Sequence, residues 1–230
     1  MASLLLNKIK FAFKQNIKPA IYLQLIAFGL GLSYFYLPVA KPYFEALANL
    51  KNNYGVLYAV VSTSLFGGLL PYLLMLLLKQ ITFKPLAQLV FYCMLWAFMG
   101  WMIDRFYTFQ GVLFGEGNDI GTIAKKVLFD QFVFTVFIAS PFLTVCLLFK
   151  EKHFKVREWL RSVDRTIITE QLPATLISTW IVWIPAVSVI YAMPSDLQIP
   201  LFNIVLCMFV LILVLVNTSH EGPEQSPTQI

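Results

Sequence analysis

Charged residues are scarce in this chain of 230 residues, and their scarcity argues against a water-soluble fold. Asp, Glu, Lys and Arg make up 13% of the sequence, whereas hydrophobic residues make up 59%. A soluble domain usually carries about 25% charged residues and about 45–50% apolar ones. The remaining charges gather in short stretches between long apolar runs. We therefore expect a chain that contacts the lipid bilayer along most of its length.

Residues that commonly carry catalysis or bind metals are also few. The chain has two histidines, His153 and His220, and three cysteines that each lie alone within an apolar run. It contains no phosphate-binding loop, no metal-ligand spacing and no Gly-x-Ser-x-Gly turn. The sequence therefore predicts no enzyme, no metal and no cofactor. A membrane enzyme that uses one Asp, or a Ser with a Lys, is the alternative left open.

Strand signals are missing as well, because no alternation of apolar and polar residues recurs along the chain. Six apolar segments are present instead, and each is close to the ~20 residues that a tilted helix needs to cross the hydrocarbon layer. These segments are 19–38, 55–78, 85–103, 127–149, 174–193 and 199–216. We expect an all-α fold, a polytopic transmembrane helical bundle of about six membrane segments with two interfacial amphipathic helices.

The two amphipathic stretches lie at 1–18 and 150–171. The first holds four lysines, no acidic residue and apolar residues at near-helical spacing, which is typical of a helix on the membrane surface. A mitochondrial targeting element has a similar composition. In the second stretch, Trp159 is the expected anchor in the headgroup layer. The domain organisation predicted is a basic segment 1–18, a transmembrane domain 19–217 and a disordered tail 218–230.

Lysine and arginine are distributed unevenly between the predicted loops. If the N-terminus lies on the inner side and the chain crosses six times, the inner loops hold twelve of these residues and the outer loops five. This asymmetry follows the positive-inside rule and places both termini on the positive side. The net charge of +5 predicts contact with anionic lipid headgroups and no contact with nucleic acid.

Polar residues inside the apolar segments are the candidate functional groups. Asp130 and Gln131 lie about one turn inside the segment 127–149, and Thr135 continues their face one turn deeper. A carboxylate within the membrane is costly unless it is paired or faces water, so a functional role is one interpretation. An i, i+4 ion pair between Lys126 and Asp130 near the interface is the other.

A second charged pair, Asp104 and Arg105, ends the segment 85–103. Adjacent opposite charges at a helix end are typical of solvated side chains or of a local ion pair. A gate, or a salt bridge to the Asp130 region, is the sharper alternative. Elsewhere, the spacing of Ser64 and Gly68 predicts close packing between helices.

The stretch 125–219 carries an ordered set of residues that resembles a known family. Its members are Lys125, Lys126, Asp130, Gln131, Trp159, Leu160, Pro173, Trp180, Trp183, Pro185, Pro194, Asn203 and Asn217. This set is similar to the family of the mitochondrial inner-membrane protein Mpv-seventeen and the peroxisomal membrane protein of 22 kDa. That family usually has Pro directly after Trp, whereas Ile184 intervenes here. The first half of the chain resembles the family poorly.

The resemblance implies a small helical bundle of an organellar membrane, mitochondrial inner membrane or peroxisome, with a role as a weakly selective channel or in metabolite and ion homeostasis. A bacterial inner membrane is the alternative location. We expect a channel or pore-type protein that passes ions or small metabolites; a non-conducting structural or adaptor protein is the alternative, and assembly into a homo-oligomer is open. The candidate pore or motif residues are Asp104, Arg105, Asp130, Gln131, Thr135, Trp180, Trp183 and Pro185.

Overall fold

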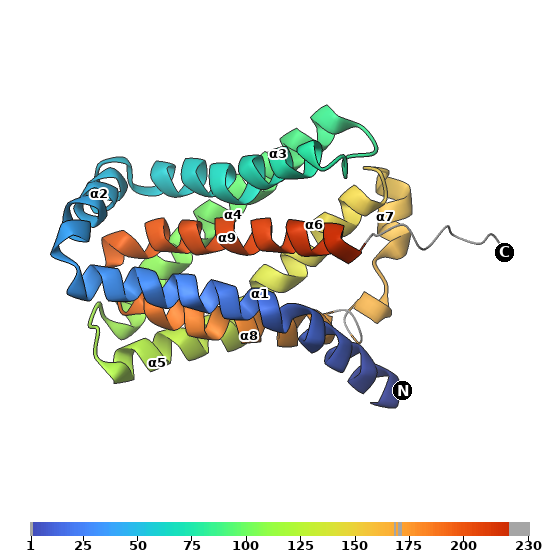
Figure 1. The fold of residues 1–230 in the computed structure, drawn as a ribbon. Helices are drawn as coiled ribbons and strands as arrows, with labels where there is room; N and C mark the ends of the chain where they lie inside the picture. The colour runs from blue at the N-terminus through green and yellow to red at the C-terminus, as the bar shows by residue number, and fades with distance from the viewer. Residues whose placement is uncertain (1, 168, 170–171, 221–230) are drawn as a thin grey trace.

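The computed structural model describes residues 2–167, 169 and 172–220, which form helices and no strands. The first turn of α1 and the last turn of α9 lie at the same end of one lengthwise bundle (Figure 1). In chain order the helical elements are α1 (Ala2–Tyr36), the 3-10 turn η1 (Pro38–Ala40), α2 (Lys41–Thr63), the π-helix η2 (Ser64–Leu69), α3 (Leu70–Leu77), α4 (Pro85–Phe114), α5 (Ile120–Phe129), the π-helix η3 (Asp130–Ala139), α6 (Ser140–Glu151), α7 (Val156–Ser162), α8 (Leu172–Tyr191) and α9 (Ser195–His220).

Several helices of the bundle are long enough to span a membrane, and its outer surface is apolar, as in membrane proteins. Among the described residues, four helical stretches are long and apolar enough to span a bilayer, namely Pro38–Leu77, Pro85–Phe114, Ile120–Glu151 and Ser195–Leu215. Two shorter apolar helices are Ala20–Tyr36 and Thr175–Tyr191. Large apolar side chains cover the outside of the bundle; Val112 is 84% exposed and Phe137 72%. The all-α membrane fold predicted from composition is confirmed, with four candidate spans.

Two predicted segment ends were wrong. The segment 85–103 continues as α4 to Phe114, so Asp104 and Arg105 lie inside a helix rather than at its end. The segment 127–149 belongs to a longer helical run from Ile120 to Glu151, so Asp130 lies about three turns from its start. In both cases charged residues were taken for helix ends, although their charges are accommodated within the bundle.

The predicted surface helices also differ from the structure. Residues 2–18 are continuous with α1, so they form no separate helix, and most of their side chains lie outside the described ones. In the second stretch, α7 is only seven residues long. Trp159 of α7 donates from Nε1 to the Val145 carbonyl at 3.0 Å, so α7 folds back onto α6. The predicted disordered tail is helical as far as His220, and 221–230 lie outside the described residues.

Helix ends follow from local chemistry. Pro85 starts α4, where its missing N–H costs nothing, and Gly115 ends it with φ of 86°. Asp119 caps α5 by accepting from the Thr122 backbone N–H at 3.0 Å. Hydrogen bonds from the Thr122 side chain and backbone hold the pKa of Asp119 below its usual value. The turn between α4 and α5 is therefore fixed at both sides.

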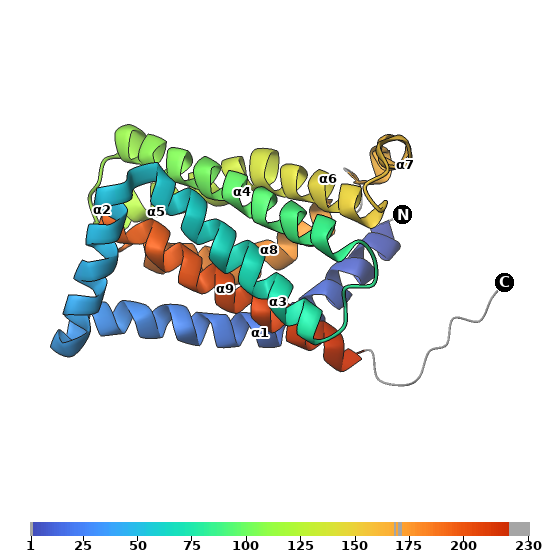
Figure 2. The same cartoon turned by 90° about the horizontal axis from the view of Figure 1, so that it is seen from above.

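Small residues let helices approach closely. A Cβ on Gly100 would lie 2.4 Å from the Ala59 carbonyl oxygen, and one on Gly68 would lie 2.8 Å from the Tyr92 carbonyl oxygen. The Ser64 hydroxyl donates to the Cys93 carbonyl at 2.9 Å, so the predicted packing role of Ser64 and Gly68 is confirmed. Seen from above, the first half of α2 crosses one end of the bundle and its second half runs along α4 (Figure 2).

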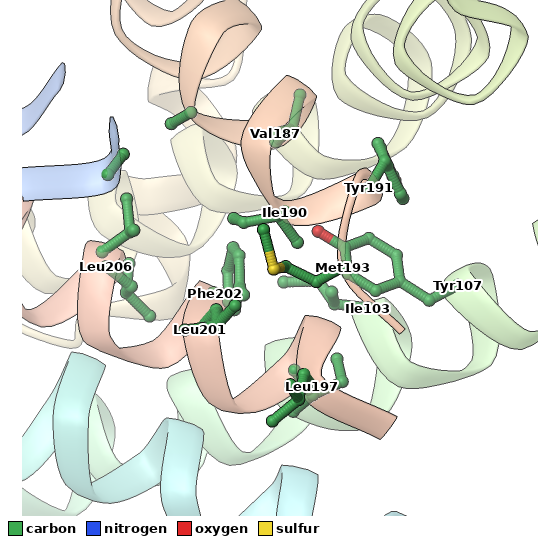
Figure 3. Close-up of a cluster of buried hydrophobic side chains, with 14 of the residues drawn as sticks. Ile103, Tyr107, Val187, Ile190, Tyr191, Met193, Leu197, Leu201, Phe202 and Leu206 are labelled. Carbon is green, nitrogen blue, oxygen red and sulfur yellow. The ribbon is translucent and has the colours of Figure 1, made fainter. Parts of the chain in front are cut away.

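The apolar core centres on α9, which packs against α1, α2, α3, α8 and η2. Most of its spanning window is buried inside the bundle, unlike those of the other candidate spans. Side chains from α4, α8 and α9 meet in this core, with Tyr107 and Tyr191 beside Met193 (Figure 3). The two tyrosines bring polar atoms to the edge of an otherwise apolar cluster.

Candidate functional site

A polar pocket of about 520 Å³ lies at the end of the bundle where α4 ends and α9 begins. One face of α4 contributes Asp104, Tyr107, Thr108 and Gly111, which follow the i, i+3, i+4, i+7 spacing of a helix face. The rest of the lining comprises charged or amide side chains, together with small or apolar residues: Lys51, Asn52, Glu116, Lys126, Asp196 and Gln198, and Val112, Gly115, Ser195 and Ile199. The pocket is thus a charged cavity at one end of an apolar bundle.

Asp104 is a buried carboxylate in the pocket wall that forms two ion pairs. Its carboxylate is 2.6 Å from the Lys51 ammonium and 2.6 Å from the Arg105 guanidinium, while its side chain is only 3% exposed. Lys51 also donates to the Gly55 carbonyl at 3.1 Å. The local ion pair of Asp104 and Arg105 is therefore present, and the partner from outside α4 is Lys51 rather than the Asp130 region. These contacts tie the crossing half of α2 to α4.

Lys126 of α5 also lines the pocket and is 2% exposed. The Gln110 side chain donates to the Lys126 backbone carbonyl at 3.4 Å, which holds α4 against α5. The ion pair between Lys126 and Asp130 does not occur among the ion pairs of the described residues. The Lys126 side chain instead lines the pocket.

Asp130 forms a second, deeper polar cluster. Its Oδ2 accepts from the Tyr191 hydroxyl at 2.5 Å. Its Oδ1 accepts from Gln131 Nε2 at 3.2 Å and from Thr135 Oγ1 at 3.3 Å. All four side chains are buried. Three donors around one carboxylate offset much of the free energy that its removal from water costs.

The π-helix η3 shapes this cluster. Residues five apart share a face of a π-helix, whereas they diverge on an α-helix, so Thr135 reaches the carboxylate of Asp130. On the same π-helix, the Gln131 backbone carbonyl accepts from Trp180 Nε1 at 2.9 Å. Widened turns of this kind occur frequently at functional sites. The structure thus brings together Asp130, Gln131, Thr135 and Trp180, four of the predicted residues.

Tyr107 connects the pocket with the deeper cluster. It lines the pocket, and its ring centre is 5.1 Å from that of Tyr191, with the two ring planes at 55° to each other. Tyr191 in turn donates to Asp130. Tyr107 and Tyr191, which lie side by side in Figure 3, therefore stand between the pocket and a carboxylate inside a candidate span. Asp130 itself does not line the pocket.

Two predicted residues lie elsewhere. Trp183 packs on Phe202 and Phe209 of α9, with ring centres 5.4 and 5.7 Å apart. Pro185 interrupts α8, and Gln24 of α1 donates to the nearby Val182 carbonyl at 2.6 Å. Trp183 and Pro185 therefore support the packing of α8 against α9 and α1. Arg105 borders the pocket through Asp104 but does not line it.

Sequence reasoning missed the two tyrosines and the residues of α2 and α9 that line the pocket. The signal for Tyr107 was present, because Asp104, Tyr107, Thr108 and Gly111 form one helix face once α4 extends past Ile103. Lys51, Asn52 and Asp196 gave no such signal, since they meet only in the folded chain.

The described residues contain no group of three His, Cys, Asp or Glu side chains suited to a metal ion. No family model matches this chain, and no curated protein and no solved structure matches it.

Proposed function

We propose that this protein is a channel or pore-type membrane protein that passes ions or small metabolites, with its path starting in the charged pocket. The observation that carries the proposal is the row of groups formed by Tyr107 in the pocket, Tyr191 packed against its ring, and the buried Asp130 that accepts from Tyr191. Ionisable groups inside a membrane bundle are rare and usually belong to a permeation or proton path. The resemblance of 125–219 to the Mpv-seventeen family supports the same function and an organellar membrane.

The proposal includes six crossings, two more than the four candidate spans. α1 and α8 are the additional ones, although their apolar stretches Ala20–Tyr36 and Thr175–Tyr191 are short. Two contacts between α1 and α8 support this. Gln24 of α1 contacts Val182 of α8, and seven residues later in each helix Gly31 faces Val189. The two helices therefore run in the same direction along the bundle. The termini then lie on one side, with the loops that hold most of the positive charge.

Flux through liposomes tests this function. The purified full chain is reconstituted, and ion flux and single-channel current are compared between wild type and Asp130→Asn. We expect flux to fall by about tenfold, or cation preference to be lost, because the substitution removes the charge on the path while keeping an oxygen that accepts a hydrogen bond. Asp164→Asn is the matched control, since Asp164 is an exposed carboxylate outside the candidate spans.

Two results would count against a pore. Equal flux in wild type and Asp130→Asn would remove Asp130 from the path. No flux from either protein, with helical content confirmed by circular dichroism, would support the non-conducting structural or adaptor protein instead.

A further inference from the structure

Lys126 presents its positive charge to the pocket. Its side chain is 2% exposed, and its ammonium has neither a hydrogen-bond partner nor an ion-pair partner among the described residues. An ammonium that reaches a recessed pocket without a protein partner favours binding of an anion there. Glu116 interacts with it electrostatically but is an exposed residue outside ion-pair distance. The pocket therefore offers one cation that has no ion-pair partner among the described residues.

The other basic side chain of the pocket is already occupied. Lys51 is bound by Asp104 at 2.6 Å and by the Gly55 carbonyl at 3.1 Å. An anionic group that enters the pocket therefore meets Lys126 as its available partner. Lys125, the neighbour of Lys126 in the chain, is exposed and does not line the pocket.

The rest of the pocket favours positive charge. Glu116 and Asp196 line it, and neither belongs to an ion pair among the described residues. Among the described residues, Asp196 accepts from the neutral amide of Asn52 at 3.1 Å, and it lies in the first turn of α9, where the helix dipole stabilises its charge. The C-terminal end of α4 at Gly111 and Gly115 adds the negative end of a 30-residue helix.

We propose that this pocket binds a small zwitterionic solute of the amino-carboxylate class. Its carboxylate pairs with Lys126, and its ammonium pairs with the acidic side formed by Glu116 and Asp196. The volume of about 520 Å³ is in the range of pockets that hold small molecules. This inference rests on the proposed function in one respect, because it names the class of solute that enters the path.

Binding to the full-length protein in lipid nanodiscs, measured by isothermal titration calorimetry, tests the inference without any flux. The probe is 5-aminopentanoate, and the matched probes are pentanoate, which lacks the ammonium, and pentylamine, which lacks the carboxylate. We expect the zwitterion to bind about tenfold more tightly than either single-charge analogue, since each charged contact contributes roughly one factor of ten. We expect Lys126→Gln to weaken its binding by about tenfold and Lys125→Gln to leave it unchanged.

Several results would overturn the inference. Pentanoate or pentylamine binding as tightly as 5-aminopentanoate would show that one charge suffices, and an unchanged affinity in Lys126→Gln would remove Lys126 from the site. If Lys126→Gln does not fold, Lys126→Arg keeps the positive charge and should keep the preference for the zwitterion, and its loss would contradict the pairing. Binding without flux would contradict the proposed pore but not this site.

Discussion

Buried polar side chains in this bundle are held by specific partners from distant parts of the chain. Asp130 is satisfied by Tyr191, 61 residues away, in addition to Gln131 and Thr135. Asn203 of α9, with no exposed surface, links to α2 in the same way, because it donates to Ser62 Oγ at 2.7 Å and accepts from Thr63 Oγ1 at 2.8 Å. Hydrogen bonds between helices therefore fix which faces of the apolar helices meet.

Substituting Asn203 tests this link. Asn203→Leu should lower the free energy of unfolding by about 1 kcal/mol, because hydrogen bonds between membrane helices are worth about 0.6 kcal/mol on average and up to about 1.7. The measurement is unfolding in mixed micelles, followed by circular dichroism. Thr63→Val and the double variant complete a double-mutant cycle. Strictly additive effects of the two substitutions would contradict the contact.

The sequence predicted Asp130 as a candidate but could not predict its partner. An acidic residue inside an apolar segment is visible in the sequence because burial of its charge is costly. Tyr191 is an ordinary aromatic residue in an apolar segment, and only the packing of α8 against η3 gives its hydroxyl a role. Lys126 was visible as a charge, but its position in a pocket depends on α2, α4 and α9 together.

At the scale of elements, the bend in α2 determines whether the pocket exists. Gly55 has φ of 52° and ψ of −126°, a conformation that residues with a side chain rarely adopt. The bend turns the first half of α2 across the end of the bundle and places Lys51 against Asp104 (Figure 2). A straight helix would carry Lys51 away from the pocket.

Gly55→Ala should therefore destabilise the protein. We expect a loss of about 1–3 kcal/mol from backbone strain, since no atom lies within 4 Å of the position of the new Cβ. Thermal unfolding in detergent measures the effect. Gly29→Ala is the matched control, because Gly29 also has space for a Cβ but has no positive φ. An equal response of the two variants would show that the bend carries no strain.

The ends of helices were the hardest feature to predict, because they also depend on contacts with distant parts of the chain. Asp104 and Arg105 read as a helix end in the sequence, yet α4 continues for nine residues beyond Arg105. The continuation is stable because Lys51, 53 residues earlier in the chain, compensates the charge of Asp104. Apolar segments are visible in composition, whereas compensation of a charge by a distant helix is not.

At the scale of the whole molecule, the packing contacts support the proposed six crossings, two more than the four candidate spans. α6 ends near the α3–α4 connection, where the His153 and Phe83 rings are 4.3 Å apart. α9 begins at the opposite end, where Ser195 and Gly115 line the same pocket. The chain between 153 and 195 must therefore travel the length of the bundle, and α8 is the element that does so. α1 runs in the same direction as α8, which places the start of α1 at the same end of the bundle as the α3–α4 connection (Figure 1).

Labelling of single cysteines checks this topology in oriented vesicles, in a background without Cys93, Cys146 and Cys207. We expect an impermeant maleimide to reach Thr82→Cys from the side on which a protease removes an N-terminal tag. Asn118→Cys, in the connection between α4 and α5, should react only from the other side. If α1 did not cross, the tag and Asn118→Cys would share a side, because Pro38–Leu77 starts at the end of the bundle where the pocket lies. That outcome would exclude six crossings and would separate the positive loops from the N-terminus, contrary to the positive-inside rule.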